Sequence, residues 1–114
     1  MSILSDLNTI LDTVGVPLET GYFSGIPPDE YLVLTPIADV FEGFADNLPQ
    51  LDLQEVMISL YSKNNYIARK DQLVKLLLGA GFSITDRRYL GFEEDTKYHH
   101  INIDVAKEYA FEED

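Results

Sequence analysis

The sequence contains no cysteine. Disulfide bonds, thiol nucleophiles and cysteine-bound zinc are therefore excluded, and the chain is compatible with a reducing cytosol. The N-terminus has no basic segment followed by an apolar one, so we expect no signal peptide. No apolar run approaches the roughly 18 residues that span a bilayer, so we expect no membrane segment. The 114 residues, 46% of them hydrophobic, fit one folded domain over residues 1–114.

Basic residues are missing from the first half of the chain. Residues 1–62 contain no Lys or Arg, and the formal net charge of the whole chain is −12. Binding to nucleic acid through its phosphates needs a basic face, so the charge argues against a direct DNA- or RNA-binding protein. Two interpretations of the asymmetry stay open. It is either a solubility surface, or one side of the molecule repels DNA or attracts a basic partner.

The clearest pattern lies in residues 55–105. Alternating apolar residues predict a half-buried strand over residues 55–62, with Val56, Ile58 and Leu60 on one face. A helix is expected over residues 66–80, capped by Asn64 or Asn65 and ended by a left-handed Gly81. Its expected apolar face consists of Tyr66, Ile67, Leu73, Val74, Leu77 and Leu78.

Two further strands follow this helix, over residues 83–91 and 98–105, with a turn at residues 93–96 between them. The last strand places four residues on its inner side: His99, Ile101, Ile103 and Val105. One helix can bury its apolar stripe on such a sheet. We therefore predict a two-layer α+β fold, in which a small, mostly antiparallel sheet packs with two helices.

The first half predicts the second of these helices over residues 2–14, with Ser2 as its cap and Gly15 at its end. Residues 18–23 fit a short edge strand, and residues 31–35 fit a further strand that Pro36 ends or places at an edge.

Residues 38–54 have few obvious core positions, and we expect them to form an acidic loop. Within it, residues 41–44 are open to two interpretations, a short strand or one arm of a hairpin. Loops of this length in compact domains tend to be functional or mobile. The chain end, residues 109–114, is expected to fray.

No arrangement of residues predicts catalysis. His99 and His100 point to opposite faces of a strand and cannot bind one metal ion, and His99 is expected to be partly buried and hydrogen-bonded. The acidic residues 93–95 lack the ligand spacing of a calcium loop, and no glycine-rich phosphate loop or nucleophile motif is present. We expect no enzyme activity, no catalytic residue, no cofactor and no metal site.

Three residues suggest an assembly contact. On the helical wheel Leu76 falls outside the expected core stripe, which is either an ordinary exposed leucine or a contact in an oligomer. Arg87 and Arg88 face opposite ways on a strand, so one can pair within the domain while the other meets the acids of a neighbour.

The second half resembles a known family. The segments that carry the resemblance are Tyr61-Ser62-Lys63-Asn64-Asn65-Tyr66, Leu77-Leu78-Gly79-Ala80-Gly81-Phe82 and Thr96-Lys97-Tyr98-His99-His100, in this order around a helix and an acidic turn. Together they resemble the tail-completion proteins of long-tailed bacteriophages, also called tail terminator or head–tail joining proteins. The first half is similar in layout only, and it departs from a closer match at residues 48–51.

The resemblance implies a virion protein without catalysis. Such a protein assembles as a ring, usually a hexamer, caps the tail tube and meets the connector or stopper protein of the head neck, while DNA passes through its lumen without specific binding. The implied location is the virion tail or neck, after assembly in the host cytoplasm. Interface candidates are Leu76, Arg87, Arg88, Phe41, Phe44, Leu48 and Leu51, and candidates for acids that face the lumen are Asp39, Glu42, Asp46 and Asp52.

Two other functions stay open. One is an acidic inhibitor that mimics DNA and blocks a nucleic-acid-binding enzyme. It would account for the negative charge, but the family resemblance would then be a coincidence. A phage neck protein at a neighbouring level, such as a stopper or an adaptor, would fit the same resemblance.

Overall fold

The computed structural model describes residues 2–43 and 51–110. Within these residues lie two α-helices and five strands. The helices are α1 (Ile3–Leu11), which continues as the 3-10 turn η1 (Asp12–Val14), and α2 (Tyr66–Gly79). The strands are β1 (Leu18–Thr20), β2 (Glu30–Glu42), β3 (Leu51–Ser62), β4 (Ser83–Phe92) and β5 (His99–Ala110).

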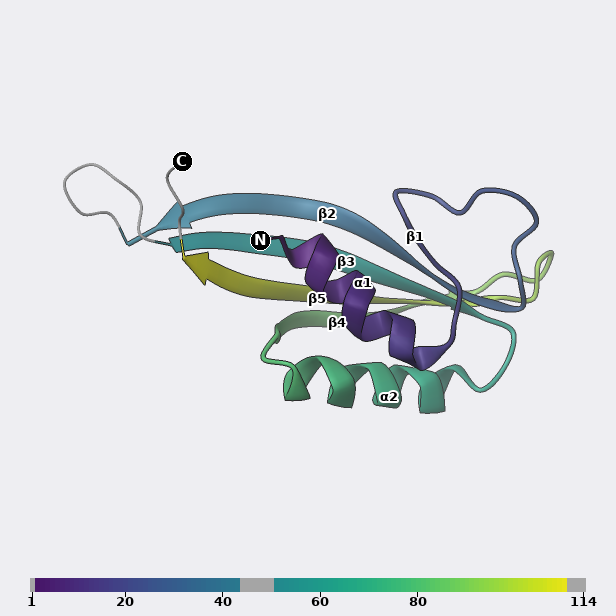
Figure 1. Ribbon diagram of the computed structural model, residues 1–114. Helices are drawn as coiled ribbons and strands as arrows, with labels where there is room; N and C mark the ends of the chain where they lie inside the picture. Colours follow the sequence, from purple (N-terminus) through teal and green to yellow (C-terminus); the bar gives the residue numbers. More distant parts are fainter. Residues whose placement is uncertain (1, 44–50, 111–114) are drawn as a thin grey trace.

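The strands form one sheet in the order β1-β2-β3-β5-β4. Only β1 and β2 pair in parallel among these strands, and the other neighbours are antiparallel. Both helices lie on one face of the sheet, and β2, β3 and β5 run past them toward one end (Figure 1). The shape is elongated, with principal extents of 55 × 26 × 24 Å. The expected two-layer α+β fold, a mostly antiparallel sheet packed with two helices, is confirmed.

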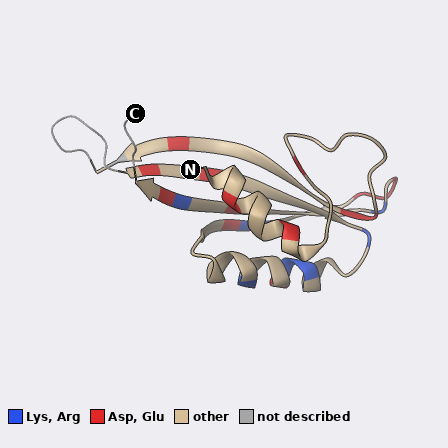
Figure 2. Ribbon diagram, in the orientation of Figure 1, with Lys and Arg blue, Asp and Glu red and all other residues tan. Residues whose placement is uncertain are grey.

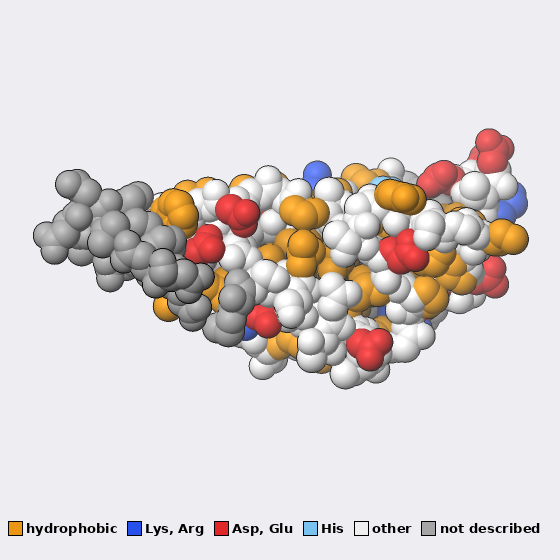
Figure 3. Space-filling view, turned by 45° about the horizontal axis from the view of Figure 1, so that its top comes forward, with side chains coloured by type: hydrophobic (Ala, Val, Ile, Leu, Met, Phe, Trp, Pro, Cys, Tyr) orange, Lys and Arg blue, Asp and Glu red, His pale blue; other side chains and the backbone are white. Residues whose placement is uncertain are grey.

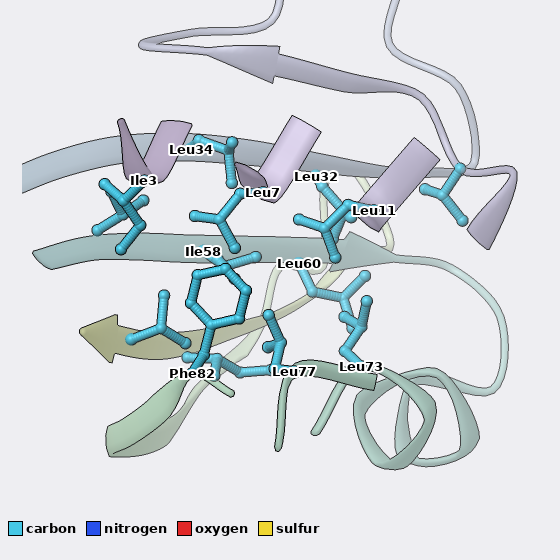
Figure 4. Packing of buried hydrophobic residues seen from close by; sticks show 14 of the residues in the cluster. Ile3, Leu7, Leu11, Leu32, Leu34, Ile58, Leu60, Leu73, Leu77 and Phe82 are labelled. Atoms are coloured by element: carbon cyan, nitrogen blue, oxygen red, sulfur yellow. The ribbon is translucent and has the colours of Figure 1, made fainter. Parts of the chain in front are cut away.

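The core lies between the helices and the three central strands. Two rows of side chains cross β2, β3 and β5: Leu32, Leu60 and Ile101, then Leu34, Ile58 and Ile103. The helices add Leu7, Leu11, Leu73 and Leu77, and all ten side chains are buried (Figure 4). Burying one such side chain contributes about 1.5–3 kcal/mol, so this layer holds the helices on the sheet.

The predicted helix over residues 2–14 is confirmed, with a change of type at its end. The Ser2 hydroxyl oxygen accepts a hydrogen bond from the Ser5 amide at 3.1 Å, which satisfies one of the free donors of the first turn. After Leu11 the helix tightens into η1, and Gly15 ends it with a φ of 80°. A tightened last turn is a common way to satisfy helix carbonyls.

Both predicted ends of α2 are confirmed. The Asn65 side chain accepts from the Ala68 amide at 3.2 Å. At the other end, the Phe82 amide donates to the Leu77 carbonyl and the Gly81 amide to the Leu78 carbonyl, while Gly81 has a φ of 90°. This is a Schellman ending, which needs a left-handed residue at the glycine position. It turns Phe82 into the core, where it is buried.

The predicted apolar face of α2 is wrong in its rotation. Leu73 and Leu77 are buried, but Ile67 and Leu78 are 52% and 56% exposed. Leu76, which the wheel placed outside the core, is half-buried and packs against it. The buried face of α2 is centred between Leu73 and Leu77. The prediction counted the exposed Ile67 and Leu78 as core residues, which shifted the predicted face away from Leu76.

The predicted acidic loop over residues 38–54 is wrong at both of its ends, and its middle, residues 44–50, lies outside the described residues. Residues 38–42 continue β2, residues 51–54 begin β3, and the two segments pair with each other. Pro36 does not end β2. Pairing with β1 stops at Leu34, and the register with β3 shifts between Pro36 and Ala38. A strand tolerates a proline at such an edge or bulge. Of the two expectations for Pro36, the edge position therefore holds and the strand end is wrong.

The last strand is longer than predicted. β5 extends to Ala110 because its final residues pair with the start of β3. Ala106 and Tyr109 are buried, so the expected fraying is wrong for residues 109 and 110. The rest of that predicted tail, residues 111–114, lies outside the described residues.

Candidate assembly surfaces

One candidate surface is the arm, which we define as residues 37–42 of β2 and 51–55 of β3. Its exposed apolar side chains are Ile37, Val40 and Phe41, each about half exposed. A second view shows hydrophobic side chains at this end of the molecule, next to acidic ones (Figure 3). The arm therefore offers apolar contact area at one end of an elongated domain.

The arm carries acidic residues and no basic ones, since neither β2 nor β3 contains a Lys or Arg (Figure 2). Asp39 is exposed and lies opposite Gln54 in the register. The Gln54 side chain accepts from the Ile3 amide of α1 and donates to Asp52 at 2.9 Å. Asp39 and Asp52 therefore lie on the side of the sheet that carries the helices.

The other candidate is the α2–β4 surface, which we define as Tyr66, Ile67, Lys70, Arg87, Tyr89 and Phe92. Most of these residues line a pocket of about 400 Å³ between α2 and β4, together with Arg88 and Ile101. Aromatic rings lie beside this pocket: His99 stacks on Tyr66 with ring centroids 4.3 Å apart, and a tilted Phe92 ring has its centroid 4.8 Å from that of His99. The Tyr89 hydroxyl also bonds to His99 Nδ1 at 2.9 Å, so the expected partly buried, hydrogen-bonded His99 is confirmed.

The two adjacent arginines play different parts, as their alternation predicted. Arg88 forms ion pairs with Asp86 at 2.8 Å and with Asp104 at 3.3 Å, on the face of the sheet that the helices leave open. Arg87 is in register with the buried Ile103, on the helix side, and forms no ion pair within the described chain. A register shift between Ile84 and Asp86 brings Arg87 to this side.

The open face of the sheet carries a row of aromatic side chains. Tyr61 stacks between Tyr31 at 4.8 Å and His100 at 4.2 Å, measured between ring centroids. Burial, with nearby Tyr61 and Tyr98, raises the pKa of Tyr31 to about 12, and burial lowers the pKa of His100 below its usual 6.5. Because these rings stack on one another, Tyr61 has no free face for a base or another flat ligand.

Next to this row the open face is polar, and most of its polar side chains form hydrogen bonds or ion pairs within the chain. The Ser59 hydroxyl donates to Asn102 Oδ1 at 2.9 Å, and both residues are buried. The ion pairs of Arg88 continue the polar band. An internally bonded face gains little from a new partner, because its polar groups would exchange one set of bonds for another. We therefore place the assembly candidates at the sheet edges.

The structure separates the residues that the sequence grouped together. Phe41 and Leu51 both lie on the arm, where Phe41 is about half exposed and Leu51 is half-buried at the start of β3. Leu76 belongs to the core edge and not to a free surface. Four candidates, Phe44, Asp46, Leu48 and the Glu42 side chain, lie outside the described residues.

Sequence reasoning missed most of the α2–β4 surface. Ile67 had been assigned to the core stripe, and its solvent exposure is decided by how α2 rotates on the sheet. Lys70 and Tyr89 carried no signal of their own, because their neighbourhood arises only when α2 packs beside β4.

The described part of the chain contains neither a metal-binding cluster nor a membrane-spanning helix. No three His, Asp or Glu side chains there gather closely enough to hold a metal ion. No described helix is long and apolar enough to cross a membrane. What the two surfaces can do is bind: the arm is acidic and apolar, and the α2–β4 surface is basic, aromatic and apolar.

Comparison with known proteins informs the fold alone. No family model matches the sequence, and no curated protein matches it. Among the solved structures that match, one covers 98% of this chain and 95% of its own, with a TM-score of 0.56 and 13% sequence identity. Its name states neither function nor source. The chain is thus similar in fold to this solved structure over 98% of its length.

Proposed function

We propose that this protein completes the tail of a long-tailed bacteriophage by forming a ring at the end of the tail tube and joining it to the head neck. One observation carries the proposal: two unlike surfaces lie on opposite edges of one sheet. The arm lies on β2 and β3, with β2 on its outer side, and the α2–β4 surface lies at the other end of the strand order. A closed ring requires such a heterologous contact, with a different patch on each side of the protomer.

The resemblance seen in the sequence supports the same function. Its segments fall on the β3–α2 connection, on the end of α2 and on the β4–β5 connection. Asn65 and Gly81 within these segments cap α2 at both ends. The motifs therefore specify this architecture, and the resemblance supplies the function that such an architecture serves.

The charge distribution fits a passage for DNA. A lumen lined by acids would not hold phosphates, because phosphate binding depends on neutralisation by cations. Asp52 lies on a segment without basic residues, near the end of the molecule. We assign Asp52, with Glu42 and Asp46, to the lumen or its rim.

Adding the purified protein to isolated tail tubes tests the function. We expect ring density at one tube end in electron micrographs, and virions assembled without the protein should show incomplete tails or tails not joined to heads. Bare tube ends would contradict the proposal. Salt-sensitive binding to a basic nucleic-acid-binding enzyme, with no effect on tails, would instead indicate an acidic DNA mimic.

A further inference from the structure

The α2–β4 surface contains two cations that lack an acidic partner. Arg87 is exposed and Lys70 is half-buried in the same pocket, and neither forms an ion pair within the described chain. Of the other cations, Lys63, Arg69, Arg88 and Lys107 have a carboxylate within 3.8 Å, whereas Lys75 and Lys97 have none within the described chain. In a chain with a net charge of −12, two unpaired cations beside exposed aromatic rings fit an acidic and apolar partner.

The backbone beside this surface is also free to pair. β4 bonds only to β5 within the described sheet, so the outer edge of β4 is open. On the opposite edge, β1 pairs only with residues 32–34 of β2, which leaves residues 35–40 without a strand on that side within the described chain. Open strand edges are templates for adding a strand from another chain.

The open part of β2 carries the group that the α2–β4 surface needs. Asp39 is exposed and has no ion pair within the described chain, and Ile37 and Val40 beside it are each 47% exposed. Asp39 lies opposite Gln54 and Arg87 opposite Ile103, both on the helix side of the sheet. If two sheets join edge to edge with their helices on the same side, Asp39 and Arg87 therefore meet on one face.

We propose that the β4 edge of one copy docks along residues 35–40 of β2 in a second copy, with Asp39 of one copy paired to Arg87 of the next. This inference rests on the proposed ring and names its protomer contact. The two edges differ, so the contact is head to tail and continues from copy to copy. Pro36 and the bulges in both strands shorten the matched edge, so the contact is weak in solution.

Asp39 thereby leaves the group of acids that the sequence assigned to the lumen. A carboxylate cannot both pair with a neighbour's arginine and stay free toward passing DNA. Asp52 keeps its assignment to the lumen, because its carboxylate bonds to Gln54 within its own chain.

Two charge reversals test the contact, Arg87→Glu and Asp39→Arg. Sedimentation velocity at millimolar concentration and low salt should show that the wild-type protein self-associates and that each variant alone stays monomeric. An equimolar mixture of the variants should self-associate again. One variant keeps an intact arm and the other an intact β4 edge, so the native contact forms between them, and the two reversed edges carry opposite charges and can form the next contact.

Placing both reversals in one chain should restore self-association beyond dimers. Lys75→Glu serves as the matched control, since Lys75 is an exposed cation of α2 outside the pocket and should leave association unchanged. Circular dichroism confirms that each variant is folded. A wild-type protein that stays monomeric, single variants that associate normally, or a mixture that does not self-associate would each overturn the inference.

Ring formation on isolated tail tubes distinguishes a wrong protomer contact from a wrong proposed function, on which this inference rests. If both single variants still form rings on tubes, the contact is wrong and the function stands. If the mixture self-associates but the wild-type protein leaves tube ends bare, the contact stands and the function is wrong. Loss of tube docking by Arg87→Glu, with self-association unchanged, would assign the β4 edge to the tube protein and also overturn the inference.

Discussion

The Tyr109 hydroxyl donates a hydrogen bond of 2.6 Å to Asp6 Oδ2, and thereby joins the end of β5 to the first turn of α1. Lys107 lies 3.8 Å from the same carboxylate oxygen. Burial and this bond raise the pKa of Tyr109. The last strand and the first helix are therefore tied together, although they are the two ends of the sequence.

Replacing Tyr109 by Phe tests this link. The ring stays buried while the bond to Asp6 is lost, so we expect Tyr109→Phe to lower the free energy of unfolding by about 1.5–3 kcal/mol, the usual range for a bond to a charged group. Urea denaturation at neutral pH measures the difference. Asp6→Asn should cost less, because an amide oxygen can still accept the bond. Equal stability of Tyr109→Phe and the wild-type protein would contradict the assignment.

The rotation of α2 predicts contrasting effects of two neighbouring leucines. Leu77 is 0% exposed and Leu78 is 56% exposed. Leu77→Ala should cost about 2–5 kcal/mol, as truncation of a buried leucine does. Leu78→Ala should change the free energy of unfolding by less than about 0.5 kcal/mol, as substitutions at exposed sites do. Denaturant melts that give similar losses for both would refute the observed helix rotation.

His100 should make the fold sensitive to mild acid. Burial lowers the pKa of its imidazole below 6.5, and its Nε2 atom is buried without a hydrogen-bond partner within the described chain. The unfolded chain therefore binds a proton at a higher pH than the folded chain. The stabilisation is complete above about pH 6.5 and is lost as the pH falls toward the folded pKa.

Two measurements test whether protonation of His100 destabilises the fold. With only two histidines in the chain, proton NMR can follow the titration of each, and the His100 signals should titrate below pH 6.5. His100→Phe keeps the stack on Tyr61 and removes the titrating group. It should lose less stability than the wild-type protein between neutral pH and mild acid. A variant with the same acid sensitivity as the wild-type protein would rule out His100 as the source.

The acids assigned to the lumen predict a defect in DNA passage. Replacing Glu42, Asp46 and Asp52 together by Lys should leave the fold intact but slow DNA release from assembled virions, because phosphates would bind the new cations. A control with the same change in net charge replaces Asp12, Asp71 and Glu94, which are exposed on other elements. Normal DNA release by the first variant, or an equal defect in the control, would count against the lumen assignment.

Local patterns in the sequence determined the elements around α2. Alternation placed Val56, Ile58 and Leu60 on the buried face of β3, and all three are fully buried. Asn65 and Gly81 fixed the ends of α2, because each end is closed by hydrogen bonds within a few residues. The α+β fold class followed from the same patterns, since an apolar stripe and an apolar strand face can bury each other.

Tertiary structure alone decided how far the strands extend and which way α2 turns. Residues 38–42 and 51–54 lack core positions, yet they are strands, because their backbones pair with each other and with the end of β5. Leu76 is half-buried while Ile67 and Leu78 stay exposed, because the sheet covers only one side of the helix. The pocket of Lys70 and Arg87 joins residues from two elements. Local sequence records hydrogen bonds and periodicity within one element, whereas strand pairing across the sheet and the packing angle of a helix depend on residues far away in the chain.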